Sequence, residues 1–132
     1  MALPIKVDKR SGIPLYIQLG EQIRLLIRNG TLEAGEAIPT VRSLAVHLGI
    51  NANTVARVYR ELQADGLLRL ERGVGTFVAQ VTASPASRHD FRQLEKKVVE
   101  TIRLGKQAGL SPAELAQLIQ TRWAQEVDNV SR

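Results

Sequence analysis

Residues 40–66 carry the pattern that most constrains the fold, because they contain two short amphipathic helices that meet at one glycine. Thr40 and Asn51 stand where helix N-caps are expected, and Gly49 stands where the first helix should end. The apolar positions recur at helical spacing: Val41, Leu44, Ala45 and Leu48 in the first helix, and Val55, Val58, Tyr59 and Leu62 in the second. Two short helices around such a turn predict a helix-turn-helix.

The residues that follow change from a helical to an alternating pattern. Leu68 and Leu70 alternate with charged residues, positions 72–75 (RGVG) supply turn residues, and positions 76–78 (TFV) are β-prone. We therefore expect a β-hairpin directly behind the second helix. The predicted fold class is mainly α with a small β-hairpin wing, that is, a winged helix-turn-helix domain.

The segments before this unit predict one more helix and two irregular stretches. Positions 15–29 place apolar residues on one helical face, and Gly30 provides a stop. Positions 31–39 are expected to be a loop. Positions 1–12 are expected to form an N-terminal arm with a short β-like run at Ile5 and Val7.

The C-terminal part of the chain predicts a linker and a helical tail. Positions 82–87 are rich in small residues and contain Pro85, which is typical of a linker. Positions 88–132 predict two helices, with a capping box at positions 111–114 (SPAE). Their apolar faces hold Leu94, Val98, Ile102, Leu115, Leu118, Ile119 and Trp123. Two helices cannot bury both faces alone, so we expect this tail to form a homodimer through a four-helix bundle.

The outward face of the second helix of the pair carries the candidate functional side chains. Asn53 lies opposite the apolar stripe, together with Arg57 and Arg60, and Thr54 lies beside them. Asparagine pairs bidentately with adenine and arginine with guanine at major-groove edges. The pattern therefore indicates base recognition, and the alternatives are a second helix cap or a solvated side chain.

The charge pattern points to a polyanionic partner. The net charge is +5 and the isoelectric point is near 10.1, and no acidic residue occurs between positions 37 and 60. A protein-docking winged helix is the alternative function, but a protein-docking face more often mixes charges of both signs. A sequence-specific DNA-binding protein is therefore favoured.

Composition excludes several other classes. The chain of 132 residues has 44% hydrophobic and 23% charged residues, as ordinary folded domains do, and it has no cysteine. His47 and His89 lack partners at metal-ligand spacing, and no catalytic constellation is present. We expect no metal, no cofactor and no enzymatic activity. No apolar run is long enough for a membrane span, and a cytoplasmic location is expected.

Three motifs together resemble the winged helix-turn-helix domain of GntR-type transcriptional regulators. They are IPTVR at positions 38–42, NANTV at positions 51–55 and GVGTFV at positions 73–78, and the similarity extends over positions 13–81. The sequence NANTVARVY and the short tail are most similar to the YtrA-type branch. The resemblance implies a DNA-binding regulator, expected to be a homodimeric repressor on an inverted repeat. The short tail leaves no room for the effector domain of the larger branches.

The resemblance also implies roles for individual positions. Arg42 matches a phosphate or groove contact, Asn51, Asn53 and Thr54 match the start of the recognition helix, and Arg72 with Gly73 matches the tip of the wing. Many family members carry Arg or Ser at position 52 and Arg at position 56, where this chain has alanine. Base recognition must then fall on Asn53, Arg57 or Arg60, and the residues do not decide which.

Overall fold

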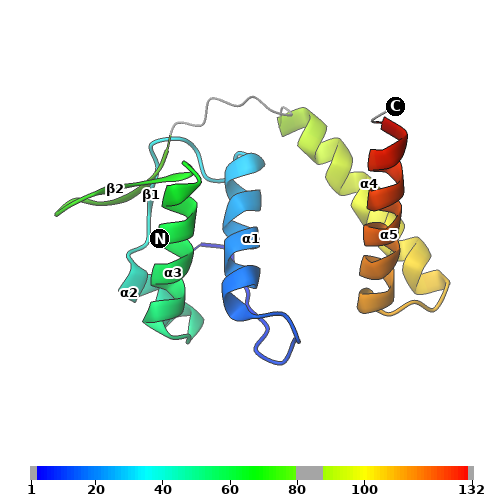
Figure 1. Cartoon of the computed structure of the whole chain (residues 1–132), viewed down its shortest axis with the longest axis horizontal. Helices are drawn as coiled ribbons and strands as arrows, with labels where there is room; N and C mark the ends of the chain where they lie inside the picture. Colours follow the sequence, from blue (N-terminus) through cyan, green and yellow to red (C-terminus); the bar gives the residue numbers. More distant parts are fainter. Residues whose placement is uncertain (1–2, 80–87, 131–132) are drawn as a thin grey trace. The chain divides into compact units, whose positions relative to one another are not determined.

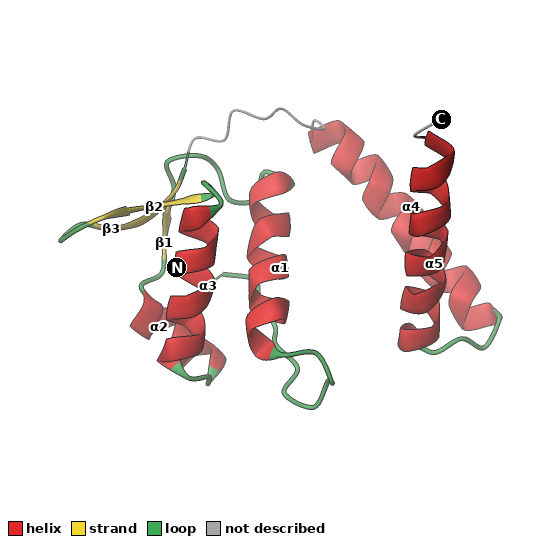
Figure 2. Cartoon of the chain, viewed as in Figure 1, coloured by secondary structure: helices red, strands yellow, loops and turns green. Residues whose placement is uncertain are grey.

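The computed structural model describes the backbone of residues 3–79 and 88–130, and the side chains of residues 3–79 and 90–126. The chain divides into two compact units, residues 1–88 and residues 89–132, which we call the head and the tail (Figures 1 and 2). The expected linker at positions 82–87 lies outside the described residues. Each unit is described by itself.

Three helices form the frame of the head: α1 (Leu15–Arg28), α2 (Val41–Leu48) and α3 (Ala52–Ala64). The Thr40 side chain caps α2 by accepting a 3.0 Å hydrogen bond from the Ser43 N–H, as expected. Gly49 ends α2 in the left-handed conformation, at φ +67°, which glycine adopts without steric cost. The predicted helix-turn-helix is therefore confirmed, with α3 as its second helix.

A three-stranded antiparallel sheet completes the head, where only a hairpin was expected. It consists of β1 (Ala37–Ile38), β2 (Leu68–Glu71) and β3 (Gly75–Val78), in the order β1-β3-β2. The predicted hairpin is β2 and β3. The prediction of a loop over positions 31–39 was wrong at its end, because residues 37–38 pair with residues 76–77. Two residues are too few for an alternating pattern to reveal a strand.

The core of the head forms around the inner face of α3. Val55, Val58, Tyr59 and Leu62 are buried, as the periodicity predicts. They pack in one cluster with side chains from every other element of the head: Leu19 and Ile23 of α1, Leu44 and Ala45 of α2, and Ile38, Leu68 and Val78 of the sheet. The Tyr59 hydroxyl donates a 2.7 Å hydrogen bond to the Pro39 carbonyl, and burial raises the pKa of Tyr59. This bond ties α3 to the segment that contains β1.

The N-terminal arm is part of this core rather than a separate extension. Leu3 and Ile5 are buried to 3% and 5% exposure, and the expected β-like run at Ile5 and Val7 forms no strand. Two glutamines of α1 pair with the arm's backbone instead. Gln22 accepts from the Lys6 N–H at 3.2 Å and donates to the Lys6 carbonyl at 2.7 Å. Gln18 holds residue 8 in the same way, so that the arm runs antiparallel to α1.

The tail contains α4 (Arg88–Gln107) and α5 (Pro112–Val130), joined by a turn in which Gly109 has φ +79°. The predicted capping box is confirmed, because the Ser111 N–H donates to Glu114 at 2.8 Å and the Glu114 N–H donates to the Ser111 hydroxyl at 3.1 Å. These bonds hold the pKa of Glu114 below its usual range. Near the turn, Gly105 is buried against Leu115. Farther along, large apolar side chains of both helices are exposed.

The arm's attachment generates a stability prediction. Gln18 accepts one hydrogen bond from the Asp8 N–H and donates two, to the Asp8 carbonyl at 3.0 Å and the Ile13 carbonyl at 2.7 Å. Because each such bond contributes about 0.5–1.5 kcal/mol net, we expect Gln18→Ala to lower the free energy of unfolding by roughly 1–3 kcal/mol in urea titrations. Gln63→Ala on α3 is the matched control, since Gln63 makes no side-chain hydrogen bond within the described residues. Equal losses for the two variants would contradict the proposed attachment.

Candidate nucleic-acid interface

The start of α3 explains why two asparagines stand so close together. Asn51 is the N-cap, and its side-chain oxygen accepts a 2.7 Å hydrogen bond from the Asn53 N–H. The capping role of the first asparagine is therefore confirmed, and its oxygen is already committed to the helix. The Asn53 side chain is exposed, and no cap position remains for it to fill. The second asparagine is thus free to contact a partner.

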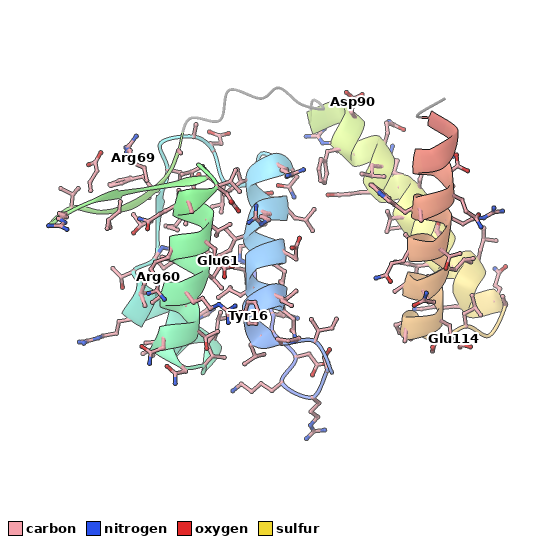
Figure 3. All side chains as sticks on the ribbon, in the orientation of Figure 1. Tyr16, Arg60, Glu61, Arg69, Asp90 and Glu114 are labelled. Carbon is pink, nitrogen blue, oxygen red and sulfur yellow. The ribbon has the colours of Figure 1, made fainter. Side chains whose placement is uncertain are left out.

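The face of α3 opposite the core presents few side chains that reach outward. Asn53 and Arg60 are both exposed and stand seven positions apart, which is two helical turns on one face. Figure 3 shows Arg60 on the side of α3 that faces away from α1. Thr54 is half-buried at the flank, and Ala52 and Ala56 are too short to reach far. This face therefore offers one carboxamide and one guanidinium as hydrogen-bond donors.

Arg57 has a different environment from Arg60. Its guanidinium lies 3.7 Å from the centre of the Tyr16 ring on α1, and its Nε donates to Glu61 at 3.2 Å. Figure 3 shows Glu61 on the side of α3 that faces α1. The expectation that Arg57 contacts bases remains a prediction, and these contacts favour a role as a clamp between the two helices. Sequence periodicity could not reveal it, because the ring comes from another helix.

Two further basic groups flank this face. Arg42 is exposed in the first turn of α2, directly after the Thr40 cap. Arg72 and Gly73 lie in the three-residue connection between β2 and β3, where Gly73 has φ +76° and the Val74 N–H donates to the Glu71 carbonyl at 3.0 Å. The left-handed residue in such a short hairpin favours glycine. Arg42 and Arg72 therefore stand at the helix start and the hairpin tip, as the sequence motifs imply.

The hairpin extends beyond the hydrophobic core. Leu68 and Leu70 point to the same face of β2, but Leu68 is buried and Leu70 is 55% exposed. On the other face, the Arg69 guanidinium lies 5.4 Å from the centre of the Phe77 ring and forms a 3.0 Å ion pair with Glu71. The outer half of the hairpin is thus a projecting wing, held by its own side-chain contacts.

The described residues contain no group of three or more histidine, aspartate or glutamate side chains placed to hold a metal ion. None of the described helices combines the length and hydropathy that crossing a membrane requires. The expectations of no metal and no cofactor stay predictions. The geometry is that of a winged helix-turn-helix protein in which the outer face of α3, the start of α2 and the wing each carry exposed hydrogen-bond donors.

Comparison with known proteins agrees with this class. The model of the family described as "Bacterial regulatory proteins, gntR family" matches residues 15–78. The regulator Rv1152 of Mycobacterium tuberculosis is 41% identical over 83 residues, which cover 63% of this chain and 69% of that protein. The transcriptional repressor YtrA of Bacillus subtilis is 29% identical over 115 residues, covering 87% and 88% of the two chains.

Solved structures extend the similarity to nearly the whole chain. YtrA from Sulfolobus acidocaldarius, a GntR-family transcription factor, has a TM-score of 0.54 at 28% identity, covering 94% of this chain and 99% of the other. The DNA-binding domain of AraR in complex with operator ORX1 has a TM-score of 0.52 at 29% identity, covering 60% and 99%. The chain belongs to the gntR family of bacterial regulatory proteins. It is a DNA-binding transcriptional regulator and not an enzyme.

The Arg57 clamp can be tested by its effect on stability. A cation–π contact at an exposed site contributes about 0.5–1 kcal/mol, so we expect Arg57→Ala to lower the free energy of unfolding by about that amount. Tyr16→Phe keeps the aromatic ring and should leave stability nearly unchanged. Arg60→Ala is the matched control on the same helix. Urea titrations that show no difference between Arg57→Ala and Arg60→Ala would count against the clamp.

Proposed function

We propose that this regulator is a repressor that binds an inverted-repeat operator as a homodimer. The observation that carries the proposal is the division of α3 into a buried apolar face and an exposed face with Asn53 and Arg60. A bound dimer blocks transcription by occupying promoter DNA. YtrA of Bacillus subtilis, which is similar over most of its length, is named as a repressor, and this supports repression rather than activation. We infer that the protein works in the cytoplasm, because its DNA is there.

Base recognition in this proposal rests on Asn53 and Arg60. The Asn53 carboxamide suits adenine, which presents one donor and one acceptor in the major groove, and the Arg60 guanidinium suits the two acceptors of guanine. Arg57 contributes less, because Tyr16 and Glu61 already hold its guanidinium. The remaining candidates position the head on the backbone. Arg42 and Arg72 neutralise phosphates. Asn51 and Thr54, at the start of α3, lie beside a DNA strand. Gly73 permits close approach of the wing to the DNA backbone.

The exposed apolar side chains of the tail support the homodimer. Leu94, Val98 and Ile102 of α4 are exposed, as are Leu118, Ile119 and Trp123 of α5, with Trp123 at 72%. Soluble chains rarely leave such a set of large side chains in water. A second copy of the tail would cover both faces in a four-helix bundle. The two-fold symmetry then places two heads on half-sites about one helical turn apart.

The identity and existence of a small-molecule effector are separate from this proposal. The cavity between α1 and α3, lined by Gly20, Arg24 and Val58 among others, has a volume of about 90 Å³. Typical ligand pockets hold about 300–1,000 Å³. This cavity is therefore too small for a typical effector, and we propose that any effector acts through the tail, by changing how the heads are presented to DNA.

If some residues contact bases and others contact phosphates, their variants should affect DNA binding in two different ways. We expect Asn53→Ala and Arg60→Ala each to relax preference at one half-site position by about 1–3 kcal/mol, because each removes a bidentate pairing. Arg42→Ala and Arg72→Ala should weaken binding to all DNA sequences equally. Each should also make the slope of log affinity against log salt shallower by about 0.9 for each phosphate that is no longer neutralised. The measurement is fluorescence anisotropy with an operator selected from a random duplex pool and with single-position variants of it. Asn53→Ala losing affinity equally for operator and random DNA would remove it as a base reader.

The tail's role predicts the assembly state. We expect the full chain to sediment as a dimer at micromolar concentration and a chain ending at Ser84 to sediment as a monomer with weaker operator binding. Ile119→Lys places a charge in the apolar face and should shift the full chain toward monomer. Gln117→Lys, on the opposite side of α5, is the control and should remain dimeric. If both lengths sediment alike, the tail is not the dimerisation element.

A further inference from the structure

We infer that Lys9 and Arg10, in the loop at the C-terminal end of the N-terminal arm, form an additional contact with the DNA backbone beside the recognition helix. The inference rests on the DNA-binding function. It adds to the head a phosphate-binding point that lies outside the helix-turn-helix and the wing. The partner is the phosphate backbone of duplex DNA flanking the half-site.

The first step is that this loop has a fixed position. The Gln18 contacts bring the backbone of Asp8 against α1, and the Arg10 N–H donates to the Asp8 carboxylate at 2.9 Å. The Ile13 N–H donates to the Ser11 hydroxyl at 3.1 Å. These bonds close a compact turn. The backbone that carries the exposed basic side chains therefore loses little conformational entropy on binding.

The second step is where the loop lies. The Lys9 ammonium donates a 2.7 Å hydrogen bond to the carbonyl of Gly49, the residue that ends α2. Gly49 is two positions before Asn51, the N-cap of α3. Figure 1 shows the loop at the end of the head where α1 and α3 both begin. The ammonium is thus anchored in the turn that leads into the recognition helix, where a DNA strand passes when the helix enters the major groove.

The third step is charge. Asp8 is the acidic neighbour of the pair, and its carboxylate accepts the Arg10 N–H. Among the described residues, neither Lys9 nor Arg10 forms an ion pair with a carboxylate. An ammonium has three donors and Gly49 takes one, which leaves two for phosphate oxygens. The exposed Arg10 guanidinium adds a second cation at the same end.

The contact is tested by the salt dependence of binding. Lys9→Gln and Arg10→Gln in the full chain should each weaken binding to operator and random duplex by the same factor. Each should make the slope of log affinity against log salt shallower by about 0.9 for each phosphate that the variant leaves without its cation. Lys9→Arg keeps the charge and should keep the slope. Lys6→Gln is the matched control, since Lys6 is an exposed lysine of the same arm whose backbone is paired to Gln22.

Three outcomes would overturn the inference. Slopes equal to that of the unaltered protein would show that neither residue contacts phosphate. A lower affinity and lower melting temperature for Lys9→Gln with an unchanged slope would show that Lys9 only supports the turn. A changed base preference in the selected operator would show a contact with bases instead. If the unaltered protein bound no duplex at all, the DNA-binding function itself would fail, which distinguishes the two failures.

Discussion

Burial of one face of α3 is the interaction on which the rest of the structure depends. Val55, Val58, Tyr59 and Leu62 pack against both other helices of the head and the sheet. Burying each of the three aliphatic side chains among them stabilises the fold by about 1.5–3 kcal/mol, whereas the exposed Arg57–Tyr16 contact contributes about 0.5–1 kcal/mol. The core therefore sets the rotation of the helix about its axis. Asn53 and Arg60 point outward because the opposite positions are occupied.

Side-chain contacts of two arginines join α1 and α3, and they distinguish these arginines from Arg60. Arg57 is held by Tyr16 and Glu61, and Arg24 of α1 pairs with Asp65 at the end of α3. Arg60 is exposed and has no such partner within the described residues. We therefore propose different roles for two arginines three positions apart: Arg57 stabilises the contact between α1 and α3, and Arg60 contacts DNA.

Much of this architecture could be predicted from sequence because its signals are local. Helical periodicity, the Asn51 cap and Gly49 define the helix-turn-helix within a few residues of each other, and turn residues define the wing. Strand β1 could not be predicted, since its two residues become a strand only by pairing with β3. The burial of Leu3 and Ile5 could not be predicted either, because they pack against residues far away in the sequence, and the arm's backbone is bonded to glutamines of a later helix. In the site, periodicity predicted the outward face of α3, but only the fold shows that Tyr16 lies beside Arg57.

We propose that the face of α3 opposite the core is the surface that binds DNA. Amide NMR spectra of the labelled full chain, recorded while a selected operator duplex is added, test it most directly. We expect large shifts for residues 51–54, Arg60 and the wing at residues 72–73, with small shifts on the exposed side of α1 at Leu25 and Arg28. Large shifts on that side of α1, with residues 51–54 and 60 unchanged, would contradict it.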